Sequence, residues 1–387
     1  MSGAPAGCPL LHAIGWFAGT TGYVHHTRAI FGALARRRAV VATNLSAGPE
    51  ETTRNLALIA RDLAPRFDIT NIALVYGHLA GGLVCCPGHR IAYTVWESTR
   101  LPQAWRRPLG AADRIWIPSR WGRDVLIDNG YDPARLDIVP EGVDLDVFHP
   151  GVPPAAPILA RRGFRFLHVG KWEARKFTPE LIKAFDDEFH ATPDVHLVLA
   201  CDNPFHKRFD LGAELRALRL RAPEKLLFIR RLADQRQVAR LYASCHAFVL
   251  PTRAEGWGLP ILEAMACGLP VIITGHSAPL DFAPPEIAHH IGHRMVDIEQ
   301  PLFEPDDGPW GQWAEPDVTH LRALMRDVLE RPLAARERGR AGAEAARRWS
   351  WDHAADMAEA ALGRLSGQPP ARPVRAPDAR AFRELDS

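Results

Sequence analysis

The sequence predicts an α/β protein with two doubly wound parallel sheets, and two observations support this. Short apolar runs alternate with amphipathic segments of helix length along most of the chain, as in parallel sheets covered by helices. A proline-rich stretch without periodicity, residues 146–157, interrupts that alternation. A chain of 387 residues, 47% of them hydrophobic, is long enough for two or three cores. We therefore expect two Rossmann-like lobes joined by a linker.

The first lobe is predicted over residues 1–150. Its expected strands are residues 11–15, 39–43, 72–75, 91–95, 114–118 and 136–139. A loop bounded by Gly19 and Gly22 precedes an amphipathic helix, and the N–H groups of such a loop can bind phosphate. The loop lacks the G-x-G-x-x-G pattern, and Asn44 stands where an NAD-binding protein carries an acid. This argues against an oxidoreductase.

The second lobe is predicted over residues 151–347. Its expected strands are residues 164–169, 195–200, 226–229, 246–250 and 271–274. Thr178, followed by a proline, and Asp234, with Gln237 three positions later, are expected to cap two of its helices. The chain turns helical from Val318, and residues 367–387 are too poor in apolar side chains to fold.

One stretch, residues 250–274, combines a strand, a loop, a short helix and a strand. Pro260 suits the first helical position, and Gly268 suits the left-handed position after the last turn. Glu255 is predicted in the loop at the carboxyl end of the first strand, where ligands of open α/β sheets bind. Glu263 is predicted in the first helical turn, where the helix dipole would keep it ionised.

These two carboxylates indicate recognition of neighbouring hydroxyl groups. An ionised carboxylate only accepts hydrogen bonds, from up to two hydroxyls at once, which suits the diol of a ribose or a hexose. Gly256 and Gly258 lie between them and would let a ligand approach the backbone closely. In the alternative interpretation Glu263 only complements the dipole and the glycines only turn the chain. That alternative is the better one for each residue alone, but the block as a whole is highly specific.

A basic loop follows the first strand of the second lobe. That strand ends at Gly170, and Lys171, Arg175 and Lys176 precede the next helix. Enzymes that release a diphosphate stabilise its charge with fixed cations and N–H groups, so we expect phosphate binding here. Taken alone, the loop is better explained as solvated and charged; phosphate binding is favoured only together with the block from Glu255 to Glu263.

The block from Glu255 to Glu263 resembles the E-x7-E signature of retaining glycosyltransferases of the GT-B fold, the family with sucrose synthases and many bacterial mannosyl- and glucosyltransferases. The resemblance implies a GT-B protein, with two Rossmann-like lobes and a deep interdomain cleft. It implies that Glu255 lies beside the donor sugar and that Glu263 holds the ribose hydroxyls. It also places Lys171 and Lys176 at the leaving diphosphate. Phe177 replaces the glycine that usually follows Lys176.

Further contacts are expected on both lobes. Candidate donor-binding residues are Gly170, Arg230, Leu232, Arg253, Gly256, Trp257, Gly258 and Leu259, together with Gly19 and Gly22. Candidate acceptor-binding residues, at strand ends of the first lobe, are His78, Trp96, Glu97 and Trp121. Many members of the family carry a histidine near Glu97, and packing explains a single tryptophan more often than sugar stacking does. The resemblance also implies that the last helix, residues 348–366, returns to the first lobe.

Three other motifs are given no catalytic or metal-binding role. Residues 139–150 resemble the family's VPNGVD element, with Glu141 in place of Asn. Asp144 and Asp146 fit a D-x-D metal motif but follow no suitable strand, and this fold class needs no metal. The histidines at 289, 290 and 293 have the wrong spacing for a closed metal site. No metal and no cofactor is expected.

Charge and hydropathy limit the partners. Acids number 45 against 47 lysines and arginines, so the net charge of +2 implies no strong attraction to nucleic acid. Residues 1–9 do not resemble a signal peptide, and no apolar run approaches the roughly 20 residues of a membrane span. Six cysteines without metal or disulfide spacing fit a reducing compartment. We expect a cytoplasmic protein with at most peripheral membrane contact.

The predicted function is retaining transfer of a hexose from a GDP- or UDP-sugar to a glycan or lipid-linked sugar, in polysaccharide biosynthesis. One alternative is a nucleotide-sugar epimerase of the same fold, and another is a non-catalytic protein that binds nucleotide sugars. The sequence leaves open the base, the hexose and the acceptor.

Overall fold

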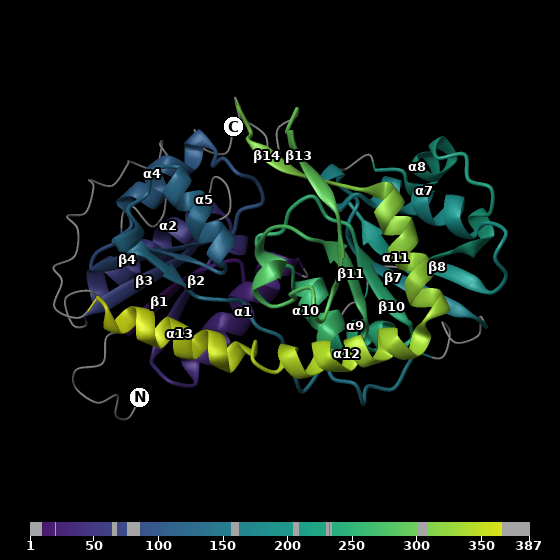
Figure 1. Cartoon of the computed structure of the whole chain (residues 1–387). Coiled ribbons are helices and arrows are strands. Elements are labelled where there is room, and N and C mark those ends of the chain that lie inside the picture. Colours follow the sequence, from purple (N-terminus) through teal and green to yellow (C-terminus); the bar gives the residue numbers. More distant parts are fainter. Residues whose placement is uncertain are drawn as a thin grey trace. The chain divides into compact units, whose positions relative to one another are not determined.

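The computed structural model describes residues 10–19, 21–63, 68–75, 86–155, 162–203, 209–229, 232, 234–299 and 308–365. The chain divides into two compact units. Unit 1 comprises residues 1–142, 297–311 and 351–387, and unit 2 comprises residues 143–296 and 312–350. Each contains one six-stranded parallel sheet, as the alternating pattern predicted (Figure 1).

The sheet of unit 1 has the strand order β2-β1-β3-β4-β5-β6. Its strands are β1 (Leu10–Gly15), β2 (Val40–Asn44), β3 (Ile69–Val75), β4 (His89–Thr94), β5 (Arg114–Ile117) and β6 (Leu136–Ile138). All six predicted strands are confirmed within two or three residues at each end. The order reverses between β1 and β3, so the loops after these two strands leave the sheet at its switch point.

Helices complete unit 1. They are α1 (Gly22–Ala35), α2 (Pro49–Leu58) with a π turn (Ile59–Leu63), α4 (Gln103–Ala111), α5 (Arg120–Asp128) and α13 (Trp351–Gly363). Helix α1 begins after Thr21, whose hydroxyl accepts a hydrogen bond from the N–H of Val24. The apolar face of α1 is buried, and helix α13 packs against α1 (Figure 1).

The sheet of unit 2 has the order β12-β11-β10-β7-β8-β9. Its strands are β7 (Phe164–Lys171), β8 (Val195–Asp202), β9 (Leu226–Phe228), β10 (Ala247–Leu250), β11 (Val271–Thr274) and β12 (His289–Ile291). Read along the chain, this is the doubly wound order in which the direction of winding changes between β7 and β10. The five predicted strands are confirmed, and the sixth, β12, contains two of the histidines interpreted as structural.

The helices of unit 2 cover both faces of its sheet. They are α7 (Thr178–Phe189), α8 (Leu211–Ala217), α9 (Gln235–Ala243), α10 (Leu259–Ala266), α11 (Val318–Glu330) and α12 (Pro332–Ala346). Asp234 caps α9 as predicted, accepting a hydrogen bond from the N–H of Gln237 at 2.8 Å. The prediction for Thr178 is wrong, because Phe177 is the cap residue of α7 and the Thr178 side chain turns to His168 instead.

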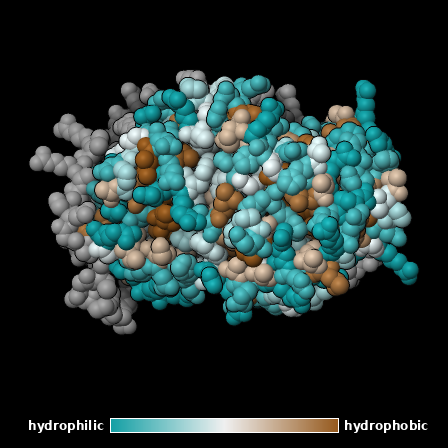
Figure 2. Space-filling view, viewed as in Figure 1, coloured by the Kyte–Doolittle hydropathy of each residue, from teal (hydrophilic) through white to brown (hydrophobic). Residues whose placement is uncertain are grey.

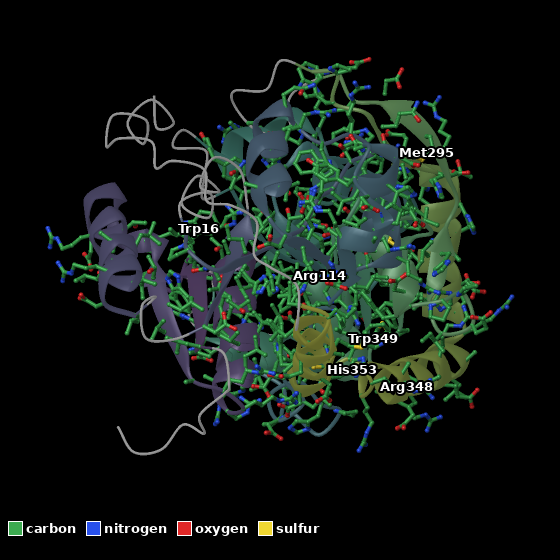
Figure 3. The ribbon with its side chains drawn as sticks, turned by 90° about the vertical axis from the view of Figure 1, so that its left-hand side faces the viewer. Trp16, Arg114, Met295, Arg348, Trp349 and His353 are labelled. Carbon is green, nitrogen blue, oxygen red and sulfur yellow. The ribbon has the colours of Figure 1, made fainter. Side chains whose placement is uncertain are left out.

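A two-stranded sheet of β13 (His293–Asp297) and β14 (Gln312–Pro316) was not predicted. Neither segment shows clean alternation, and β13 is largely exposed. Met295 on β13 is one of the few exposed large apolar side chains in the described part of the chain (Figure 3). On the face shown in Figure 2, hydrophobic side chains form small separate patches in a largely hydrophilic surface.

The segment predicted as a linker contributes to a core. Phe148 is fully buried in unit 2, where its ring packs edge-on against Tyr242 at 6.0 Å between centroids. Unit 2 begins at Val143. The compositional signal, four prolines without periodicity, marks the lack of regular structure but not the lack of packing.

Candidate functional site

The candidate site lies at the switch point of the sheet in unit 2. Strands β7 and β10 are parallel neighbours, with Ala247 opposite Phe166 and Phe248 opposite Leu167. Carboxyl ends of parallel strands lie at the same edge, so the loops that follow β7 and β10 leave the sheet side by side. The first loop carries the predicted lysines, and the second carries Glu255.

Backbone hydrogen bonds hold these two loops together. The carbonyl of Arg175 accepts from the N–H of Arg253 at 2.7 Å and from the hydroxyl of Thr252 at 3.2 Å. Phe177, just beyond, has a left-handed backbone with a φ of 59°. Glycine adopts this conformation without the roughly 1–2 kcal/mol that a side chain costs there. The backbone path expected of a glycine is therefore kept, and the Phe177 ring is buried.

Lys176 and Glu255 form a buried ion pair. The Lys176 Nζ donates to the Glu255 Oε1 at 2.5 Å, and the two residues are only 6% and 4% exposed. Burial alone would raise the pKa of Glu255, but Lys176 and Arg175 lower it to about 2. Burial lowers the pKa of Lys176, and the Glu255 charge opposes that effect. Glu255 is therefore ionised at any physiological pH, as the prediction of its role requires.

A third loop fixes the backbone of Glu255. The hydroxyl of Ser277, after β11, accepts a hydrogen bond from the N–H of Glu255 at 2.9 Å and donates one to the carbonyl of His276. The φ of Ser277 is 64°. Strain of this kind persists only where surrounding contacts over-determine it, and here the contacts hold a residue of the candidate site.

Arg175 also contacts Glu255, which the sequence did not reveal. Its Nη1 donates to the Ala254 carbonyl at 2.6 Å and lies 3.3 Å from the Glu255 Oε2, and its Nη2 donates to the Glu173 Oε1 at 2.7 Å. Lys171 Nζ lies 3.4 Å from the other oxygen of Glu173. The site is thus an alternating row of three cations and two carboxylates. The alternation of charge at 171, 173 and 175 was the available signal.

Glu263 requires a correction. Helix α10 begins at Leu259, so Glu263 lies beyond its first turn, and Pro260 is the second helical residue. The Glu263 carboxyl is buried, with Tyr242 Oη at 3.0 Å from its Oε2. Burial raises the pKa of Glu263 to about 8, so the prediction of an ionised side chain is wrong for the ligand-free protein.

The hydrogen bonds around Tyr242 agree with a protonated Glu263. Tyr242 Oη also lies 3.1 Å from the Pro260 carbonyl, and one phenolic proton cannot serve both oxygens. If Tyr242 donates to that carbonyl, a protonated Glu263 can donate to Tyr242, and both groups are then satisfied. A neutral carboxyl can both donate to and accept from a ligand hydroxyl.

Gly258 forms the turn between the two acids, and this matches the alternative interpretation of that glycine. Gly258 has a φ of 104° and precedes α10, whose first residue is Leu259. Gly256 is buried. The Trp257 ring is buried in the core against Phe282 and Trp349, so its side chain is a packing group.

Arg253 is engaged by protein groups. Its guanidinium donates to both oxygens of Glu315, at 2.6 and 3.1 Å, and lies over the rings of Phe177 and Trp313. The expected carboxylate partner is present, and it comes from β14. Leu232 packs against the core of unit 2. A Cβ on Gly170 would lie 3.6 Å from the Lys176 stem, so this glycine adjoins the candidate lysine.

His168 lies on β7, just before the loop that carries the lysines, and the sequence analysis did not single it out. Burial lowers its pKa to about 4, so the imidazole is neutral. Its Nδ1 lies 3.1 Å from the Val249 carbonyl and its Nε2 lies 3.0 Å from the Thr178 hydroxyl. The Nδ1 therefore donates to the carbonyl, and the Nε2 accepts from Thr178. This ties β7 to β10 and to the start of α7.

The predicted residues of unit 1 are partly described. Gly19 has a φ of 117° and is exposed, and Gly22 is the first residue of α1. Trp96 is buried, and its indole N–H donates to the Ser98 hydroxyl and the Arg100 carbonyl, so its place is explained by packing.

Two of the remaining candidate residues are described by the structure, and two are not. Glu97 lies in the loop after β4, and Trp121 packs on the core of unit 1. His78 and Arg230 lie outside the described residues.

Within the described ranges no group of three His, Cys, Asp or Glu side chains is placed to hold a metal ion. In the same ranges no helix has the length and apolarity of a membrane span.

Parts of the chain match known proteins. Residues 163–294 match the family profile described as Glycosyl transferases group 1. The chain is 26% identical over 268 residues to D-inositol 3-phosphate glycosyltransferase of Segniliparus rotundus, covering 66% of this chain and 54% of that protein. The enzyme of the same name from Mycobacteroides abscessus is 32% identical over 169 residues, 42% of this chain and 36% of that protein. The chain thus spans about half the length of the curated relatives it matches.

Solved structures show the same fold. Sucrose-phosphate synthase of Thermosynechococcus elongatus has a TM-score of 0.68 at 17% identity, over 92% of this chain and 99% of that one. HepE of Anabaena in complex with UDP-glucose has a TM-score of 0.69 at 15% identity, with the same coverage. The two six-stranded parallel sheets and these neighbours define a GT-B fold with two Rossmann-like lobes.

Proposed function

We propose that the chain is a glycosyltransferase that moves a hexose from a nucleotide-diphosphate sugar to an acceptor hydroxyl. The observation that carries the proposal is the buried pair of Lys176 and Glu255 at the switch point of unit 2, where open α/β sheets bind nucleotides. The family profile covers this site, and one protein of the same fold is described in complex with UDP-glucose.

The proposed roles follow the chemistry of each group. Lys176 and Lys171 would stabilise the negative charge of the departing diphosphate. Glu255 would orient the hexose and stabilise positive charge at its anomeric carbon. Glu263 would hold a ribose hydroxyl, as acceptor or as donor according to its protonation.

We further propose that transfer retains the anomeric configuration. Both Glu255 oxygens face cations, Lys176 at 2.5 Å and Arg175 at 3.3 Å, which makes this carboxylate a poor nucleophile. Front-face attack needs no protein nucleophile: the bond from the anomeric carbon to the phosphate oxygen breaks, the acceptor oxygen bonds to that carbon, and the acceptor proton passes to the phosphate.

The donor and acceptor are proposed as classes. UDP- and GDP-hexoses are the candidate donors, and a glycan or a lipid-linked sugar is the candidate acceptor. The curated relatives are named for D-inositol 3-phosphate, which adds a phosphorylated cyclic polyol to the acceptors to be tested. No cofactor is proposed.

The test is turnover of UDP-glucose and GDP-mannose by the full chain, with and without a panel of acceptors that includes inositol 3-phosphate. We expect product only with an acceptor, an unchanged anomeric configuration by NMR, and a rate at least about 100-fold lower for Glu255→Gln and for Lys176→Ala. Donor conversion to its epimer without acceptor would favour the epimerase. Binding without any product would favour a scaffold, and wild-type rates in both variants would overturn the assignment.

A further inference from the structure

Lys176 has spare hydrogen-bonding capacity, whereas the head group of Arg175 is held in place. An ammonium has three donors, and in the described part of the chain Glu255 Oε1 is the only hydrogen-bond partner of the Lys176 Nζ. Arg175, by contrast, is anchored by the Ala254 carbonyl, by Glu173 and by Glu255, and its own carbonyl binds the next loop. Lys176 can therefore turn toward a ligand while Arg175 stays.

The difference between Lys176 and Arg175 affects the charge of Glu255. If Lys176 shares its charge with a bound diphosphate, Glu255 loses part of the field that keeps it ionised in a buried place. A buried carboxylate without a counter-charge takes up a proton or moves. Arg175 faces the other oxygen of Glu255, so it can maintain the charge and position of this carboxylate.

We propose that Arg175 is a positioning residue that keeps Glu255 ionised and fixed while Lys176 engages the donor diphosphate. This inference rests on the proposed function, since it assumes a donor diphosphate at Lys176. Arg175 itself does not touch the substrate. A guanidinium suits the role because its rigid fork holds a carbonyl and two carboxylates at once, which a lysine cannot do.

The test is the pH profile of kcat and of KM between pH 4.5 and 9, using UDP-glucose or GDP-mannose, whichever the wild-type chain turns over. Wild type should show no acid limb from Glu255, whose pKa is about 2. Arg175→Met should leave KM within about threefold at pH 8. Its kcat should gain an acid limb, with at least a roughly fivefold fall between pH 8 and pH 5. Arg175→Lys should show a smaller fall.

The matched control is Arg326→Met. Arg326, on α11, also donates to a carboxylate and a carbonyl, those of Glu188, and it lies outside the candidate site. Its profile should equal that of wild type. A profile of Arg175→Met that is only scaled down, without a new acid limb, would overturn the inference and show a structural role. Should Arg175→Met fail to fold, an Arg175→Lys profile equal in shape to wild type would overturn it equally.

The inference about Arg175 and the proposed function can be contradicted separately. If Glu255→Gln abolishes transfer while neither Arg175 variant gains an acid limb, the inference fails and the proposed function stands. If the wild-type chain turns over neither donor, or Glu255→Gln transfers normally, the proposed function fails first.

Discussion

Glu255 and Glu263 lie eight positions apart, yet their pKa values move in opposite directions. Both are buried, and burial raises the pKa of a carboxyl. Lys176 and Arg175 reverse this effect and lower the pKa of Glu255 to about 2, whereas the pKa of Glu263, which is hydrogen-bonded to the Tyr242 hydroxyl, rises to about 8. The difference is therefore the presence of cations, which come from another loop of the chain.

The pKa of Glu263 makes the stability of unit 2 dependent on pH. Its pKa in the folded protein is about 8, above the ordinary value of 4.5 for a glutamate. Between about pH 4.5 and 8 the native state therefore binds one proton more than the unfolded state does. Stability is then lost as pH rises through that window, by a few kcal/mol at most. Glu263→Gln mimics the protonated form, so we expect it to lose less stability than wild type between pH 5.5 and 8.5.

The measurement is the urea midpoint of each protein at the two pH values. The exposed Glu337 on α12 offers a matched control, and Glu337→Gln should follow wild type. Equal pH dependence of Glu263→Gln and wild type would show that Glu263 is ionised in the native state.

The sequence predicted those residues of the candidate site that belong to a recognisable motif. It missed the residues whose contacts are with groups distant in sequence. Glu255 and Lys176 were predicted together, and they pair. Arg175 and Tyr242 could not be assigned, because their partners lie 80 and 21 positions away and no local pattern indicates which groups meet. The ionised state of Glu263 was predicted wrongly, because the predicted helix start at Pro260 is one residue later than the actual start at Leu259 and because the carboxyl is buried.

At the scale of elements, α13 is attached to α1 by a row of ion pairs. The three arginines that follow α1 meet three acids on α13: Arg36 pairs with Asp352, Arg37 with Asp356 and Arg38 with Glu359. At the other end of α13, Arg364 and the buried Arg114 (Figure 3) both bind Asp137 on β6. The arginine run was visible in the sequence, but its partners, over 300 positions away, were not.

These pairs should differ in strength because they differ in exposure. The Arg38 Nε donates to both oxygens of Glu359, and the side chains are only 20% and 25% exposed, against 61% and 65% for Arg36 and Asp352. We expect Arg38→Met to destabilise unit 1 by about 1 kcal/mol, and Arg36→Met by less than about 0.5 kcal/mol. Urea midpoints at low salt measure this. Equal losses in the two variants would contradict the argument.

The strands that sequence missed are short or unpatterned. The run His289–Ile291 carries two histidines in three residues, and β13 and β14 lack a buried face along their whole length. Several strands predicted correctly, namely β1, β4, β5, β10 and β11, are buried on both faces, as expected for strands covered by helices on each side. Hydrophobic periodicity thus predicts the apolar strands of both six-stranded sheets, including three of their four edge strands, and misses the short polar ones.

At the scale of the whole molecule, each unit repeats one arrangement: a six-stranded parallel sheet with a single switch point. In unit 2 the charged row lies at that point, on the loops after β7 and β10. In unit 1 the loop with Gly19 follows β1, one of the two strands at the switch point. The fold was predictable because both sheets rest on local patterns, whereas the charged row depends on contacts between loops far apart in sequence.

Binding of a nucleotide diphosphate at the site of Lys176 and Glu255 is measured by calorimetric titration. The full chain is titrated with UDP, GDP and ADP, and with the matching nucleosides. We predict that wild type and Arg326→Met bind one of the diphosphates, and that Lys176→Ala binds it at least about tenfold more weakly with no change for the nucleoside. Equal affinity of wild type and Lys176→Ala for that diphosphate, or no binding of any of the three, would contradict the account.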